Sequence, residues 1–205
     1  MKRAIAVALI CAAFTAFASG CVTMGERHPT ATIVFSDFGT INFRLYPEYA
    51  PNTVANFIEL ANSGYYDGSP VHRIEEYFVI QMGKTADSNA PDAGYAIKGE
   101  FPNNGYTKNE LEHLLGTVSM ARSEDSFDSA SAQFFICTRN QIPLDGNYAA
   151  FGRVTEEKSL NVLIKISQMD VDPATMVPRD EIYIVSCSVE TFGKSYGKPK
   201  TMPKP

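Results

Sequence analysis

The 205-residue sequence contains no tryptophan, only three histidines and only four cysteines. The histidines, at positions 28, 72 and 113, lack the spacing of metal ligands, and so few cysteines exclude a disulfide-stapled scaffold. There is also no basic excess: 18 Lys and Arg stand against 23 Asp and Glu, with a pI of about 5.2. This balance argues against a nucleic-acid partner and against electrostatic binding to a membrane. We therefore expect neither a metal site nor a nucleic-acid surface.

The rest of the composition is that of an ordinary globular protein. Hydrophobic residues make up 44% of the chain, and 13 Phe and 10 Tyr supply aromatic volume for the core of one domain. The segment Gly193-Lys194-Ser195-Tyr196-Gly197 matches Gly-x-Ser-x-Gly, but it has no strand-to-helix context, so it does not indicate a serine hydrolase. The segment 193–199 is one residue too short for a phosphate-binding loop, and no Ser or Thr follows its second lysine.

The N-terminus has the pattern of a secretory signal. Lys2 and Arg3 precede an uncharged run over 4–18 that is too short to span a bilayer comfortably. The segment Ala18-Ser19-Gly20-Cys21 resembles the bacterial lipoprotein box, although Leu is more usual than Ala at its first position. We predict a signal peptide over 1–20, lipidation at Cys21 and a tether over 21–29, which places the protein outside the cytoplasm on a bacterial membrane, facing the periplasm in a Gram-negative cell. The alternatives are a single N-terminal anchor helix, or ordinary cleavage that leaves Cys21 as a free thiol.

Two further features concern the mature chain. Cys137 and Cys187 both lie in apolar or β-rich runs, so we expect buried free thiols, with a disulfide between them as the alternative. The tail over 194–205 is rich in Lys and Pro and is predicted to be disordered.

Hydrophobic periodicity predicts a single mainly β domain over 30–193. Alternating apolar residues around 36–39 indicate a β-hairpin, and helical spacing predicts helices over 51–64 and 156–168. Many short strands with two helices favour a closed or nearly closed antiparallel β-barrel. The further predicted strands are 71–74, 78–82, 95–98, 117–121, 133–137, 149–154 and 181–189.

Several separated segments carry a family resemblance. They read HRI…FVIQMG over 72–83, VSMAR over 118–122, SAQFFICT over 131–138 and LDGNYAAFGRV over 144–154. In order and approximate spacing they resemble the signature segments of the cyclophilin family of peptidyl-prolyl cis-trans isomerases, over about residues 30–192. The resemblance implies a closed eight-stranded antiparallel barrel capped by two α-helices. It also implies catalysis without a metal, nucleotide or organic cofactor, on proline-containing polypeptides, and we expect a monomer.

The resemblance also implies roles for individual residues. Arg73 would donate to the proline carbonyl and polarise the twisted prolyl nitrogen, and Gln81 would position Arg73 and a substrate carbonyl. The implied catalytic residues are Arg73, Phe78, Gln81 and Phe135. The implied substrate-binding residues are Val79, Ala121, Arg122, Gln133, Leu144 and Tyr148. His72 and His113 are expected to be structural, because bond rotation moves no proton.

The segments also depart from the family pattern. Pro143 stands where many members have an indole, Tyr148 where His is frequent, and Arg122 where eukaryotic members have Asn. We expect weak cyclosporin binding as a result. The leading prediction is a lipid-anchored isomerase that assists the folding of secreted or envelope proteins. The alternatives are a non-catalytic module that binds proline-containing peptides and a structural envelope lipoprotein.

Overall fold

A computed structural model describes residues 27–85 and 93–205. The predicted signal peptide over 1–20 and the predicted lipidation site Cys21 lie outside these residues. Within the described ranges, no helix combines the length and the apolar character needed to cross a bilayer.

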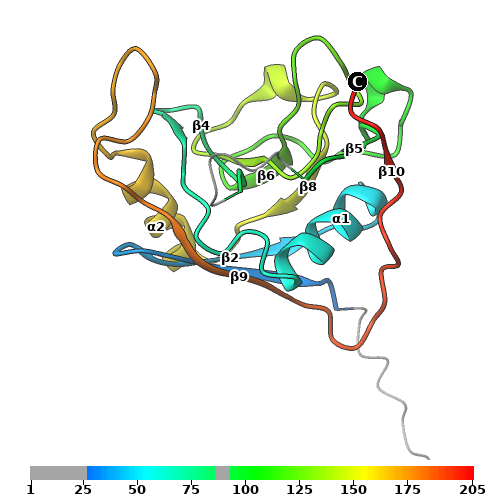
Figure 1. The fold of residues 1–205 in the computed structure, drawn as a ribbon, viewed down its shortest axis with the longest axis horizontal. Coiled ribbons are helices and arrows are strands. Elements are labelled where there is room, and N and C mark those ends of the chain that lie inside the picture. Colours follow the sequence, from blue (N-terminus) through cyan, green and yellow to red (C-terminus); the bar gives the residue numbers. More distant parts are fainter. Residues whose placement is uncertain (1–26, 86–92) are drawn as a thin grey trace, which may run out of the picture.

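One curled antiparallel sheet of eight strands forms most of the domain (Figure 1). The strand order is β3-β4-β7-β6-β8-β2-β1-β9. The strands are β1 (Thr30–Phe35), β2 (Gly39–Leu45), β3 (Arg73–Glu75), β4 (Val79–Met82), β6 (Thr117–Met120), β7 (Phe134–Cys137), β8 (Ala150–Arg153) and β9 (Ile184–Glu190). Along β1 every second side chain is buried, including Ile33 and Phe35, which is the alternation that the sequence predicts. The mainly β prediction is confirmed.

The closed barrel predicted from the sequence is wrong, because the sheet is open. Among the described strands, β3 and β9 are its two edges and do not pair with each other. The segment before β3 bonds the start of β9 instead. The backbone N–H of Gly68 donates to the Ile184 carbonyl at 2.7 Å, and that of Val71 donates to the Ile182 carbonyl at 2.9 Å. The residues that bond the start of β9 thus precede β3, and β3 itself pairs only with β4. Loop hydrogen bonds therefore replace a continuous seam.

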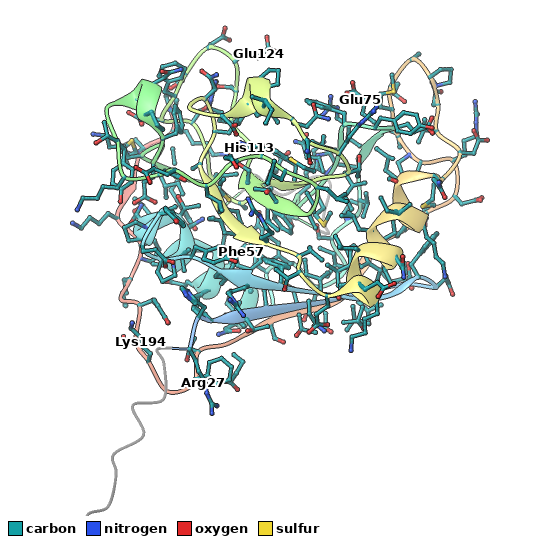
Figure 2. All side chains as sticks on the ribbon, turned by 180° about the vertical axis from the view of Figure 1, so that it is seen from behind. Arg27, Phe57, Glu75, His113, Glu124 and Lys194 are labelled. Atoms are coloured by element: carbon teal, nitrogen blue, oxygen red, sulfur yellow. The ribbon has the colours of Figure 1, made fainter. Side chains whose placement is uncertain are left out.

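The two predicted helices are present and lie on opposite sides of the molecule in the view of Figure 1. Helix α1 (Pro51–Asn62) packs along β9, and α2 (Glu157–Ser167) packs along β2. Phe57 of α1 sits at the centre of the core (Figure 2). Its ring centroid lies between 5.2 and 5.6 Å from those of Phe43, Tyr66, Phe134 and Phe151. These aromatic contacts join α1 to β2, β7 and β8.

The start of α1 depends on a distant carboxylate. Ala50 precedes the helix and has no side-chain acceptor for the first N–H groups. Glu100 takes this role: its carboxylate accepts hydrogen bonds from the backbone N–H of Asn52 at 3.0 Å and of Thr53 at 2.8 Å. The Thr53 hydroxyl donates to it at 2.7 Å as well. Glu100 is therefore buried with its acceptors used.

The predicted disorder of the tail over 194–205 is also wrong. The tail runs past α1 and ends in β10 (Thr201–Met202), which pairs with β5 (Ala96–Ile97) (Figure 1). Asn52 holds the backbone of Lys200 from both sides: the Lys200 N–H donates to Oδ1 at 2.7 Å, and Nδ2 donates to the Lys200 carbonyl at 3.1 Å. Main-chain hydrogen bonds thus order a segment whose composition offers little apolar area to bury.

Short 3₁₀ helices and the two cysteines complete the domain. The 3₁₀ helices span Pro102–Asn104 and Ile142–Leu144, and the second forms part of the site described below. Cys137 and Cys187 are free and buried, which confirms the expectation of free thiols. Burial raises the pKa of Cys137 to about 12 and that of Cys187 still further, so neither is an activated nucleophile.

Candidate active site

A row of four residues crosses adjacent strands at one end of the sheet. In the strand register, Arg73 of β3 is opposite Gln81 of β4, Gln81 is opposite Phe135 of β7, and Phe135 is opposite Ser119 of β6. Directly paired residues of an antiparallel ladder project to the same face. The register thus brings an arginine, an amide and an aromatic ring to one surface, in that order.

A pocket opens over this row. Its walls come from β3, β4 and β7, the segment after β6, and the 3₁₀ turn at Leu144. Val79, Phe135 and Cys137 form a small buried cluster, separate from the main core, on which Phe78, Ala121, Leu144 and Tyr148 pack. The lining residues are Arg73, Phe78, Val79, Gln81, Ala121, Arg122, Phe135, Leu144 and Tyr148. The result is an apolar hollow with cationic and amide groups at its edge.

Arg73 is held at this edge by three neighbours. Its Nη1 lies 3.5 Å from Gln81 Oε1, its Nη2 forms an ion pair with the Glu75 carboxylate, and its guanidinium lies 5.7 Å from the centre of the Phe78 ring. Gln81 is oriented in turn, because its Nε2 donates to Gln133 Oε1 at 3.1 Å. The Arg73 side chain is 34% exposed, so part of its donor fork faces the pocket mouth.

Beneath the pocket floor lies a buried hydrogen-bonded chain. His113 Nδ1 is 2.8 Å from Asp145 Oδ1, and His113 Nε2 is 3.0 Å from Ser119 Oγ. The His113 ring stacks under Phe135, with centroids 6.1 Å apart and planes at 20°. Burial lowers the pKa of His113 against the opposing effect of Asp145, which favours a neutral ring.

Ser119, His113 and Asp145 are the residue types of a hydrolase triad, but their position excludes that role here. Ser119 has no exposed surface and His113 has 1%, so no scissile carbonyl can reach the hydroxyl. The chain is instead a support for Phe135. This burial and these contacts agree with the structural role expected for His113, which lies in the interior of the molecule (Figure 2).

Arg122 forms the opposite wall within a cage of aromatic rings. Its guanidinium lies 4.6 Å from the centre of the Tyr148 ring, 4.9 Å from that of Phe127 and 5.7 Å from that of Phe101. Its Nε donates to the carbonyl of Asn147 at 3.1 Å. These contacts fix the arginine beside the pocket.

The structure brings the residues singled out from the sequence into one place. Nine of the ten residues assigned to catalysis or substrate binding line the pocket, and the tenth, Gln133, lines an adjoining polar hollow and contacts the pocket through Gln81. Sequence reasoning missed Glu75 and the link from His113 to Asp145 and Ser119. A carboxylate two residues after Arg73 on the same strand was the available signal for Glu75.

No metal centre accompanies the pocket within the described residues. They contain no group of three or more His, Cys, Asp or Glu side chains placed to hold a metal ion. What the arrangement offers is a shaped apolar hollow with fixed hydrogen-bond donors at its edge. Such a site is suited to binding a ring and a carbonyl rather than to covalent chemistry.

Comparison with known proteins agrees with this geometry. Residues 30–189 match the family described as cyclophilin type peptidyl-prolyl cis-trans isomerase/CLD. Peptidyl-prolyl cis-trans isomerase B of Bacillus subtilis is 41% identical over 62% of this chain and 83% of its own length. Peptidyl-prolyl cis-trans isomerase A of Dickeya dadantii is 33% identical over 92% of this chain and 97% of its own length.

A solved structure is similar as well. A cyclophilin-type isomerase from Cryptosporidium parvum, crystallised in the presence of the dipeptide Ala-Pro, superposes with a TM-score of 0.66 at 27% identity. The match covers 78% of this chain and 98% of that one. The family match and the similar structure, together with the fold and the pocket, place the chain in the class of cyclophilin-type peptidyl-prolyl isomerases. The chain belongs to the cyclophilin family and is a peptidyl-prolyl cis-trans isomerase, which confirms the enzyme prediction.

Proposed function

We propose that Arg73, Phe78, Gln81 and Phe135 catalyse rotation about X-Pro bonds in this pocket. The observation that carries the proposal is the edge of the pocket, where the partly exposed Arg73 guanidinium stands beside the apolar floor formed by Phe135 and Val79. The pyrrolidine ring of a client occupies the floor, and Arg73 donates to the adjoining prolyl carbonyl. The Ala-Pro dipeptide present with the Cryptosporidium relative supports a proline-containing ligand.

The chemistry required is modest because no covalent bond breaks. Partial double-bond character gives the C–N bond a rotation barrier of about 18–20 kcal/mol. In the twisted state the prolyl nitrogen is pyramidal and basic, and a guanidinium aimed at it stabilises that state over the planar ones. Each 1.36 kcal/mol of such differential binding accelerates exchange about tenfold. Preorganised donors such as Arg73, oriented by Gln81, are the type of group that supplies it.

The remaining wall residues act on the polypeptide around the proline. Ala121 and Gln133 lie on adjoining segments, joined by the hydrogen bond from the Ala121 N–H to the Gln133 carbonyl at 2.9 Å. Arg122, Leu144 and Tyr148 complete the wall. We assign these residues, with Val79, to substrate binding.

The test uses Arg73→Ala with Arg179→Ala as its matched control. Arg179 also pairs with a carboxylate, Asp170 at 3.1 Å, but lies outside the pocket. Exchange NMR on a short X-Pro peptide should show at least a tenfold loss of catalysed isomerisation in Arg73→Ala and wild-type rates in Arg179→Ala. Circular dichroism checks that both variants are folded. Equal rates in the two variants would contradict the role of Arg73.

The second part of the proposal concerns location. We infer from the segment 18–21 that Cys21 carries lipid and that the enzyme acts on secreted or envelope proteins at a bacterial membrane. Cells fed labelled palmitate should label the wild-type protein and the Cys11→Ala variant, and should leave Cys21→Ala unlabelled. Labelling of Cys21→Ala would contradict the anchor.

A further inference from the structure

The ion pair between Glu75 and Arg73 places a carboxylate beside the group that we assign to catalysis. The Arg73 and Glu75 side chains are 34% and 39% exposed. A partly exposed ion pair such as this one adds only modestly to folding stability, because water screens it and both side chains lose rotamer freedom. Stability is therefore a weak reason for a glutamate at position 75. The effect of its charge on the neighbouring site is a stronger reason.

The strand register places Glu75 next to the pocket. Arg73 and Glu75 are two residues apart on β3 and share a face. Their partners across the ladder are Gln81 and Val79, and both partners line the pocket. Glu75 thus stands beside the pocket rim, near the outer surface, whereas His113 lies in the interior (Figure 2).

The charge at this rim is asymmetric. Arg73 and Arg122 line the pocket and are both cationic. Glu75 brings negative charge to the Arg73 side of it. The next residue, Glu76, carries the same charge but lies elsewhere, in a surface hollow that it shares with Ile74 and with Ser167 at the end of α2. The two neighbouring glutamates therefore differ in position and match in chemistry.

We propose that Glu75 is a specificity residue: its carboxylate makes binding depend on the charge of the client residue that follows the proline. This rests on the proposed function, in which Arg73 binds the prolyl carbonyl. That carbonyl carbon is bonded to the nitrogen of the next residue, whose Cα lies about 3.8 Å from the prolyl Cα. The following side chain therefore passes close to the Arg73–Glu75 pair. Lys or Arg at that position is attracted by the carboxylate, and Asp or Glu is repelled.

The experiment compares two peptides that differ only in having Lys or Glu after the proline. Exchange NMR on the purified protein gives kcat/KM for each, and the measured quantity is their ratio. A unit charge about 6 Å away at a solvated surface changes binding about threefold. Since the peptides carry opposite charges, Glu75→Gln should lower the Lys-to-Glu ratio about tenfold at low ionic strength. Glu76→Gln should leave the ratio at the wild-type value.

Two further measurements separate the outcomes. Raising the salt to about 0.5 M should bring the wild-type ratio close to that of Glu75→Gln, because the screening length falls below the charge separation. A purely structural role for Glu75 would lower both rates together and leave the ratio unchanged, which would overturn the proposal. An equal change in Glu76→Gln would overturn it too. Failure of the proposed function is recognised separately, as full activity of Arg73→Ala on both peptides.

Discussion

Acidification to pH 5 is expected to destabilise the protein through His72. Burial, assisted by the charge of Lys84, lowers the pKa of His72 from 6.5 to about 4. Between these two values the unfolded chain binds a proton at this site and the folded protein does not. Because the unfolded state then binds more protons, the free energy of unfolding falls as the pH falls through 6.5, and it stops falling near 4.

The size of the effect follows from the same two pKa values. At pH 7.5 both states are largely unprotonated at His72, so the site contributes little. At pH 5 protonation favours the unfolded state by about 2 kcal/mol. Burial also lowers the pKa of His113, which adds to the loss in the same direction. Few ordinary carboxylates change charge between pH 7.5 and 5, so histidines dominate this interval.

The assay is urea unfolding, followed by circular dichroism at pH 7.5 and pH 5. The matched variant is His72→Gln, which retains a polar side chain that does not titrate. Its loss of stability on acidification should be smaller than that of the wild type by about 2 kcal/mol. Equal stability of the wild-type protein at the two pH values would refute the reasoning. So would a loss in His72→Gln as large as that of the wild type.

Two other predictions concern the supports of the fold. Glu100→Ala removes the carboxylate that caps α1 and should lower the free energy of unfolding by about 2 kcal/mol in urea titrations, and a change below about 0.5 kcal/mol would contradict the cap. Deletion of 194–205 removes the β10–β5 pairing and the Asn52–Lys200 contact, and should lower the free energy of unfolding by about 1 kcal/mol. The rate of isomerisation should stay within twofold of the wild-type value, because no residue of the tail lines the pocket. A larger loss of isomerisation than of stability would show that the tail acts on the site.

The local sequence pattern predicts the helices and strands of this fold well, but it does not predict whether the sheet closes into a barrel. The start of α1 at Pro51 and the alternation in β1 are local properties, set by backbone geometry and side-chain period, and both are found where the sequence places them. Closure of the sheet depends on whether the free edges of β3 and β9 lie side by side and in register. That depends on segments more than one hundred residues apart, and no local period reports it.

The tail shows the same limit in another way. Its composition correctly indicates little apolar burial, yet Lys200 is held by Asn52, 148 residues earlier in the chain. Backbone hydrogen-bond partners are a property of the folded surface. Composition therefore predicts how much a segment buries and says little about whether a neighbouring surface will order it.

The pocket residues were predictable only as a constellation. Phe135 and Leu144 taken singly are typical core residues, and the signature segments together indicate that they share a site with Arg73. The support beneath them was not predictable, since His113 reaches Asp145 across 32 residues and stacks on Phe135 only in the folded chain. The identity of a floor residue is thus readable in the sequence, while the contacts that hold it are not.

The division between floor and rim constrains where client selectivity can reside. The floor is apolar, and beneath it His113 lies buried in an environment that lowers its pKa, because a charge there would lose its hydration. Arg73 avoids this cost by remaining partly exposed and paired with Glu75. The floor can therefore select for the shape of the proline ring and not for charge. The proposed discrimination between charged clients therefore belongs to the rim, where the partly exposed Glu75 pairs with Arg73.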